Sequence, residues 1–213
     1  MSRPPLSPDR VVDAASRVAD ASGLAGVSMR SVGRELGVEA MSLYHHVASK
    51  DALLDGLADW VFQRIATPSP SGPWRSEMEE RARSARAVLA AHPWGLGLLE
   101  SRRSPGPATL DHHDAVLGCL RAAGFSVALA GHAFSVLDAY TYGFVLTEVN
   151  LPFGPGESAD DFVAGLGPLA DAHPHLAEMV AEQVVGRDYA YGDEFDYGLA
   201  LVLDGLEARF AAA

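Results

Sequence analysis

The sequence predicts an all-α protein with a small N-terminal unit and a larger C-terminal domain. Apolar residues recur every three to four positions in one segment after another, which is the period of an amphipathic helix. The regular alternation of apolar and polar residues that marks a half-buried strand is not found in any segment. The stretch TPSPSGP, residues 67–73, is rich in helix breakers and separates the two parts.

The charge of the chain is unevenly distributed. The protein has 213 residues and a net charge of −12, so as a whole it does not have the composition of a nucleic-acid-binding protein. Residues 1–50 nevertheless carry six basic and five acidic side chains, and this net of +1 leaves −13 for the remainder. Such asymmetry indicates that the two parts perform different tasks.

Cysteine content and hydropathy favour a cytoplasmic protein. Cys119 is the only cysteine, which excludes an intrachain disulfide and a zinc site built from several thiolates. The N-terminus, MSRPPLSPDR, lacks the apolar core of a signal peptide. His132 and Asp138 interrupt the most apolar stretch, so we predict neither a membrane span nor a membrane partner.

The N-terminal unit, residues 1–50, is predicted to contain three helices. Ser7-Pro8-Asp9 is a helix start signal, and Ser22-Gly23 ends this first helix. A second helix begins near Ser28 and is interrupted at Gly37, a residue that readily adopts the positive φ of a tight turn.

The second domain, residues 51–213, is also predicted to be helical. Ser49 caps a fourth helix over residues 50–66, which connects the two domains. Further helices are predicted over residues 74–91, 94–101, 108–123, 126–149, 158–172, 175–185 and 194–210.

The third helix, within residues 40–47, has an unusual outer face. Only Leu43 and Val47 have the four-residue spacing of a buried stripe, so we predict that they pack on the first two helices. Two helices joined by a glycine-containing turn form a helix-turn-helix pattern, in which the last helix enters the major groove of DNA. The polar and aromatic residues left on the outer face are Met41, Ser42, Tyr44, His45 and His46.

These side chains suit DNA recognition. Tyr and His donate hydrogen bonds to phosphate oxygens, and Met packs against a thymine methyl group. Arg30, near the start of the second helix, is placed to reach a guanine edge. Lys50, the only lysine, lies in the first turn of the fourth helix, where its own helix dipole does not favour a cation, so a phosphate contact is expected.

Two alternatives remain open on these residues alone. Helix-turn-helix shapes also occur in helical ligand-binding or scaffold proteins that bind no specific DNA. The run Asp111-His112-His113-Asp114 also suggests a metal-dependent phosphohydrolase. Neighbouring residues on a helix point about 100° apart, however, so the two histidines cannot chelate one metal from one face. We therefore do not predict an enzyme.

One segment resembles a known family. Residues 28–57, SMRSVGRELGVEAMSLYHHVASKDALLDGL, closely resemble the DNA-binding segment of the tetracycline-repressor (TetR) family. The resemblance lies in a serine-initiated second helix, the Leu36-Gly37-Val38 turn, Leu43-Tyr44 with His46, and Lys50. The later runs LRAAGFS and YTYGFVLTE resemble the C-terminal domain of the same family.

The resemblance implies a homodimeric transcriptional repressor that binds palindromic double-stranded DNA under the control of a small-molecule effector. It implies DNA contacts by Ser28, Met29, Arg30, Ala40, Met41, Ser42, Tyr44, His45, His46 and Lys50. Ala40 departs from the tetracycline repressor, which has a long polar side chain at the matching place, so the operators should differ at that base pair. The helices 126–149 and 194–210 are too apolar around their circumference to face water, so we predict that they form the dimer interface, through Val136, Tyr140, Phe195, Leu199, Leu203 and Leu206.

The resemblance also implies an effector cavity, lined by Trp60, Glu100, Arg103, His113, Val116, Phe134, Asp138 and Tyr142. Glu100 stands about where the tetracycline-binding member has a histidine for its drug-bound magnesium, and Val116 replaces an amide-bearing pocket residue. Tetracycline is therefore not the expected effector. No metal and no cofactor are implied.

Overall fold

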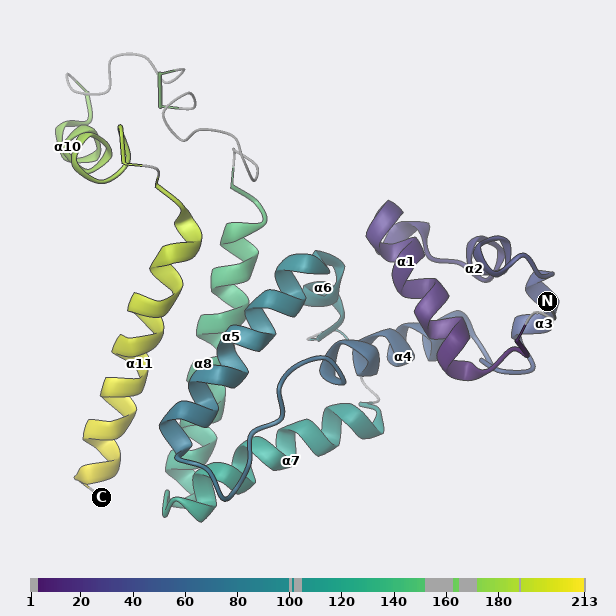
Figure 1. Cartoon of the computed structure of the whole chain (residues 1–213), viewed down its shortest axis with the longest axis horizontal. Coiled ribbons are helices and arrows are strands. Elements are labelled where there is room, and N and C mark those ends of the chain that lie inside the picture. The colour runs from purple at the N-terminus through teal and green to yellow at the C-terminus, as the bar shows by residue number, and fades with distance from the viewer. Residues whose placement is uncertain are drawn as a thin grey trace.

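The computed structural model describes residues 4–99, 101, 105–151, 163–164, 172–187 and 189–212. Every regular element within these ranges is a helix (Figure 1). The elements are α1 (Pro8–Gly26), α2 (Met29–Leu36), α3 (Ala40–Leu43), α4 (Lys50–Phe62), α5 (Trp74–Ala91), η1 (Pro93–Gly95), α6 (Leu96–Leu99), α7 (Pro107–Ala122), α8 (Val127–Glu148), α10 (Pro174–Gln183), η2 (Tyr191–Asp193) and α11 (Glu194–Ala211). The predicted all-α fold class is confirmed.

Side-chain caps fix the starts of the N-terminal helices. The hydroxyl of Ser7 accepts the amide of Arg10 at 3.3 Å, and that of Ser49 accepts the amide of Ala52 at 3.1 Å, as their N-cap positions require. Ser28 and its partner Ser31 form a reciprocal capping box at the start of α2. The predicted end of the first helix at Gly23 is instead a kink, because α1 resumes for a further turn to Gly26.

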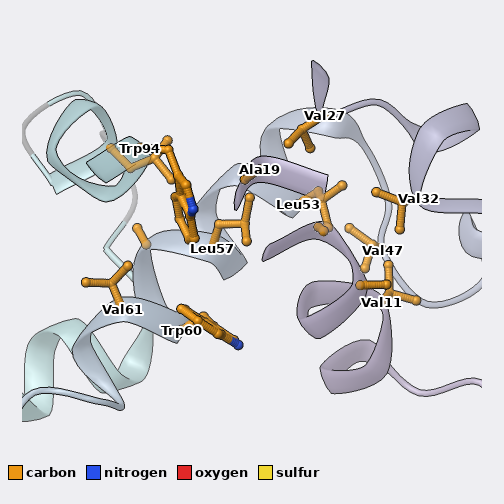
Figure 2. Packing of buried hydrophobic residues seen from close by; sticks show 14 of the residues in the cluster. Val11, Ala19, Val27, Val32, Val47, Leu53, Leu57, Trp60, Val61 and Trp94 are labelled. Atoms are coloured by element: carbon orange, nitrogen blue, oxygen red, sulfur yellow. The ribbon is translucent and has the colours of Figure 1, made fainter. Parts of the chain in front are cut away.

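The first core cluster holds the N-terminal unit together and continues into the second domain. We call α1, α2 and α3 the head. Figure 2 shows Val11, Val32 and Val47 at the head end of this cluster, with Leu53 of α4 beside them. The cluster continues through Trp94 to Leu98 of α6 and Val145 of α8, which lie in the second domain. Because α4 contributes buried side chains along its whole length, the head and the second domain share one core.

The second domain surrounds a separate core. Helix α8 packs against α5, α7 and α11, and Figure 1 shows α11 lying along α8. Phe125, Leu137 and Leu203 are fully buried in this cluster. None of the helices that the structure describes is long and apolar enough to cross a membrane.

Two carboxylates of α1 accept hydrogen bonds from tryptophans beyond the head. Asp13 of α1 accepts the indole N–H of Trp60 at 2.7 Å, and Asp20 accepts that of Trp94 at 2.6 Å.

The predicted helix over 158–172 lies mostly outside the described residues. The helices predicted over 74–91, 108–123, 126–149 and 194–210 match α5, α7, α8 and α11 to within one residue at each end.

Candidate functional site

The helix-turn-helix geometry depends on two glycines. Gly37 ends α2 in the left-handed region, at φ 61°, which is costly for residues with a Cβ. At Gly33, a Cβ would lie 2.9 Å from the carbonyl oxygen of Val38 and 3.2 Å from the amide nitrogen of Ala40. The absence of side chains at these positions therefore allows α3 to approach α2 closely.

Helix α3 presents its apolar residues inward and its polar ones outward. Leu43 is fully buried and Val47 nearly so, as predicted, whereas Met41 is 73% exposed. Tyr44 and His45 are exposed, and Ala40, Ser42 and His46 are half-buried. The exposed Met41 and Tyr44 thus lie together with His45 on the outer face of α3.

Two cations flank this outer face. Arg30 on α2 and Lys50 at the start of α4 are both exposed. Within the described residues neither belongs to an ion pair, in contrast to Arg17, whose guanidinium lies 2.8 Å from Glu35. Both cations are therefore available to phosphate or to base edges.

Met29 cannot contact DNA as predicted. Its side chain is only 6% exposed and packs in the head core, because the first position of α2 faces α1. Ser28 is half-buried, and its hydroxyl is occupied by the capping box with Ser31. The predicted reading surface therefore begins at Arg30.

A buried polar cluster lies in the second domain. Its members are Arg81 of α5, His112 of α7, and Asp138 and Tyr142 of α8. The guanidinium of Arg81, which is only 1% exposed, donates from Nη2 to Asp138 Oδ1 at 2.5 Å and from Nε to His112 Nε2 at 3.0 Å. The hydroxyl of Tyr142 is hydrogen-bonded to Asp138, and burial raises its pKa. The cluster thus pairs a buried guanidinium with a carboxylate that is 14% exposed.

The protonation state of His112 follows from its partners. Arg81 Nε carries a hydrogen and can only donate, so His112 Nε2 accepts. Burial, and secondly the positive charge of Arg81, lowers the pKa of His112 to about 3, so the ring is neutral near pH 7. Its single proton therefore resides on Nδ1, which is buried and has no hydrogen-bond partner among the described residues.

Aromatic rings connect this cluster to α4. The ring of Phe62, the last residue of α4, lies 5.3 Å from that of His112 and 5.1 Å from that of His113. The ring of Phe134 lies 5.1 Å from His113 on the other side. All three distances are measured between ring centroids. Burial lowers the pKa of His113 as well. Phe62 belongs to the head core and Phe134 to the second core, so these rings bridge the two.

The predicted effector residues fall into three groups. His113, Phe134, Asp138 and Tyr142 meet around the polar cluster, and Val116 is fully buried in the same core as Phe134. Glu100 and Arg103 lie outside the described residues. Trp60 lies apart from them, because its indole donates to Asp13 of the head and its ring packs against Trp94 and His92.

Sequence reasoning missed Arg81 and Phe62, and it considered His112 only as part of a possible metal site. A signal for Arg81 and His112 was present in the helical spacing. Arg81 follows Met78 by three residues and precedes Ala85 by four, on the buried stripe of α5. His112 precedes Val116 by four on the buried stripe of α7. A titratable residue on an apolar stripe is a candidate for a polar partner inside the core.

An open groove of about 590 Å³ borders the polar cluster. It runs between α6 and α8 and is lined by Leu96, Ala139, Gly143 and Leu146. Tyr142 lines the same groove, so one side chain separates the groove from Asp138. No group of three or more His, Cys, Asp or Glu side chains within the described ranges is arranged to hold a metal ion.

Family profiles match both parts of the chain. The profile described as "Bacterial regulatory proteins, tetR family" matches residues 11–57, and that of "Tetracyclin repressor-like, C-terminal domain" matches residues 67–210. The helix-turn-helix head and the helical second domain thus define a DNA-binding transcriptional regulator. The chain belongs to the TetR family.

Relatives and solved structures agree with this assignment. The chain is 34% identical to the transcriptional repressor DrrR1 of Streptomyces coeruleorubidus, over 98% of this chain and 80% of that protein. It is 32% identical to the class A tetracycline repressor from transposon 1721 of Escherichia coli, over 96% of this chain and 92% of that protein. The crystal structure of apo ActR from Streptomyces coelicolor superposes with a TM-score of 0.79 at 27% identity, covering 100% of both chains. ActR has also been solved with actinorhodin, at a TM-score of 0.78, 27% identity and 97% coverage of both chains.

Proposed function

We propose that this protein is a homodimeric repressor that binds a palindromic operator and responds to a small organic effector. The observation that carries the proposal is the outer face of α3, where Met41, Tyr44 and His45 are exposed while Leu43 and Val47 hold the helix on the head core. The exposed Arg30 and Lys50 flank this face. Access to DNA requires a cytoplasmic location.

The homodimer rests on the outer faces of α8 and α11. Val136, Ala139, Gly143 and Leu146 are exposed and recur every three or four residues along α8. On α11 the same spacing links four exposed residues, Tyr197, Leu201, Gly205 and Ala208. Two apolar stripes on adjacent helices match a four-helix interface between two copies.

Five of the six residues predicted for this interface face the core of their own chain. Phe195, Leu199, Leu203 and Leu206 are between 0% and 7% exposed, because α11 turns this stripe toward α8 and α5 of its own chain. Tyr140 is half-buried and donates its hydroxyl to the carbonyl oxygen of Phe195. The proposed interface keeps only Val136, which is 41% exposed.

Effector control is supported by the position of the polar cluster. Its residues come from α5, α7 and α8, and Phe62 brings the end of α4 into contact with its histidine. A molecule that bound there would act directly on the helix that leads to the head. Structures of ActR with actinorhodin support an organic molecule as the effector.

Selection from random duplexes tests the DNA-binding proposal. We expect a palindromic consensus, with affinity that falls as salt rises. Arg30→Ala should relax specificity at one position of each half-site and cost about 1–3 kcal/mol. Lys50→Ala should weaken all sequences alike and reduce the salt dependence. Recovery of no sequence preference would reject the proposal.

A further inference from the structure

The polar cluster contains one buried hydrogen-bond donor that is not paired with any of the residues the structure describes. Nδ1 of His112 is buried and has no partner among the described residues, although His112 as a whole is only 2% exposed. Buried polar groups in proteins are nearly always hydrogen-bonded, to protein or to a bound molecule. Nδ1–H is therefore expected to donate to a bound molecule, and its surroundings limit the chemistry of that molecule.

The charge of the cluster limits what this partner can be. Arg81 and Asp138 neutralise each other at 2.5 Å, and the hydroxyl of Tyr142 also interacts with Asp138. An anion would gain no net positive charge here and would lie close to the Asp138 carboxylate. A cation would face the guanidinium of Arg81. The unused group is an N–H, so its partner must be a hydrogen-bond acceptor. Because neither an anion nor a cation is favoured here, that acceptor is uncharged, such as a carbonyl oxygen.

The surroundings of His112 indicate the shape of the molecule. The ring of Phe62 contacts the imidazoles of both His112 and His113, at centroid distances of 5.3 and 5.1 Å. Phe134 continues this row of rings beyond His113. The two imidazoles lie 6.4 Å apart, and Phe62 packs against both of them. A flat aromatic ring is therefore a shape that fits against this pair of histidines, because Phe62 supplies one.

We propose that His112 Nδ1–H donates to the carbonyl oxygen of an uncharged, planar aromatic effector whose ring system displaces Phe62 from its place against His112 and His113. The inference deepens the proposed effector control and rests on it. Since Phe62 is the last residue of α4, its displacement acts on the helix that carries the head. Arg81 and Asp138 are positioning residues, because they hold the His112 ring through Nε2.

Matched pairs of small molecules test this inference. 9-Fluorenone and fluorene differ only by a carbonyl in place of a methylene group, and so do xanthone and xanthene. Calorimetric titration of the full-length protein without DNA should show at least one ketone binding about ten-fold more tightly than its methylene partner, the contribution of one hydrogen bond. The ratio should fall to within about two-fold in His112→Phe and persist in His112→Gln, which retains an N–H donor.

A spectroscopic measurement keeps the test independent of variant folding. In the unmutated protein, the ¹⁵N and ¹H resonances of His112 Nδ1–H should shift on addition of the ketone that binds and stay in place with its methylene partner. Equal affinity within both pairs, no binding by either ketone, or an unmoved Nδ1–H resonance would each overturn the inference. An ordered water that is hydrogen-bonded to Nδ1 in the ketone complex would do the same. These titrations contain no DNA, so their failure is distinguishable from failure of operator binding.

Discussion

At the scale of single residues, His112 couples folding to pH. The ring is neutral when buried, with a pKa of about 3, but in the unfolded chain it titrates near its ordinary value of 6.5. The unfolded state therefore binds a proton that the folded state refuses, and stability falls as the pH drops below about 6.5 toward 3.

The expected loss is measurable. Between pH 7 and pH 5 this one group should remove roughly 2 kcal/mol from the free energy of unfolding. His112→Gln cannot titrate, so urea unfolding of this variant should lack that part of the pH dependence. Equal pH profiles for the two proteins between pH 5 and 7 would show that His112 is not held neutral. His113 is present in both proteins, so its contribution cancels in the comparison.

The residue scale also shows what spacing alone can and cannot predict. Leu43 and Val47 are buried as their four-residue spacing predicts. Met29 is buried in the head core, and the first residue of a helix gives no periodic signal for which side it faces. Trp60 donates to Asp13, which lies 47 residues away, and no local pattern reveals such a contact.

At the scale of elements, α4 and α7 are joined by a carboxylate that caps a helix from another segment. Asp59 of α4 accepts the amides of Ala108 and Thr109, at 3.1 and 2.8 Å, and the hydroxyl of Thr109 at 2.9 Å. Helix α7 has no side-chain cap at its own N-cap residue, Gly106. A negative charge at this end of a helix is also favoured by the helix dipole.

Removal of this cap should loosen the joint. Asp59→Ala leaves the first amides of α7 without their acceptor, so we expect a loss of about 1–2 kcal/mol in the free energy of unfolding. Asp59→Asn keeps one acceptor oxygen and should lose less than Asp59→Ala does. Urea denaturation of the three proteins gives the order. If both variants match the parent, the cap contributes nothing to stability.

Helix positions were largely predictable, whereas the contacts between helices were not. Ser7, Ser28 and Ser49 cap helices as expected, because an N-cap depends on residues within one turn. Which stripe of α11 faces α8 depends on the other helices. Both sides of α11 are apolar, and the sequence did not distinguish the stripe of Leu199 from that of Leu201.

At the scale of the whole molecule, α4 connects the proposed reading face to the proposed effector site. Its first residue is the exposed Lys50, and its last is Phe62, against the histidines of α7. Asp59 joins it to the start of α7 in between. A helix held at both ends transmits a shift at one end to the other, and such coupling between two ligands is reciprocal. DNA should therefore weaken an effector by the factor by which the effector weakens DNA.

The dimer provides the last prediction, because a palindrome is read by two heads at a fixed spacing. Leu201 is 58% exposed on the outer stripe of α11, whereas Leu199 is 1% exposed on the inner stripe. Leu201→Arg should leave the protomer folded and split the dimer by placing an unpaired charge in the proposed interface. Leu199→Arg places the same charge in the protomer core and should unfold the chain instead. Light scattering with circular dichroism distinguishes these outcomes. An unmutated protein that scatters as a single 22.5 kDa chain at micromolar concentration, or a Leu201→Arg variant that remains dimeric, would contradict the proposed interface.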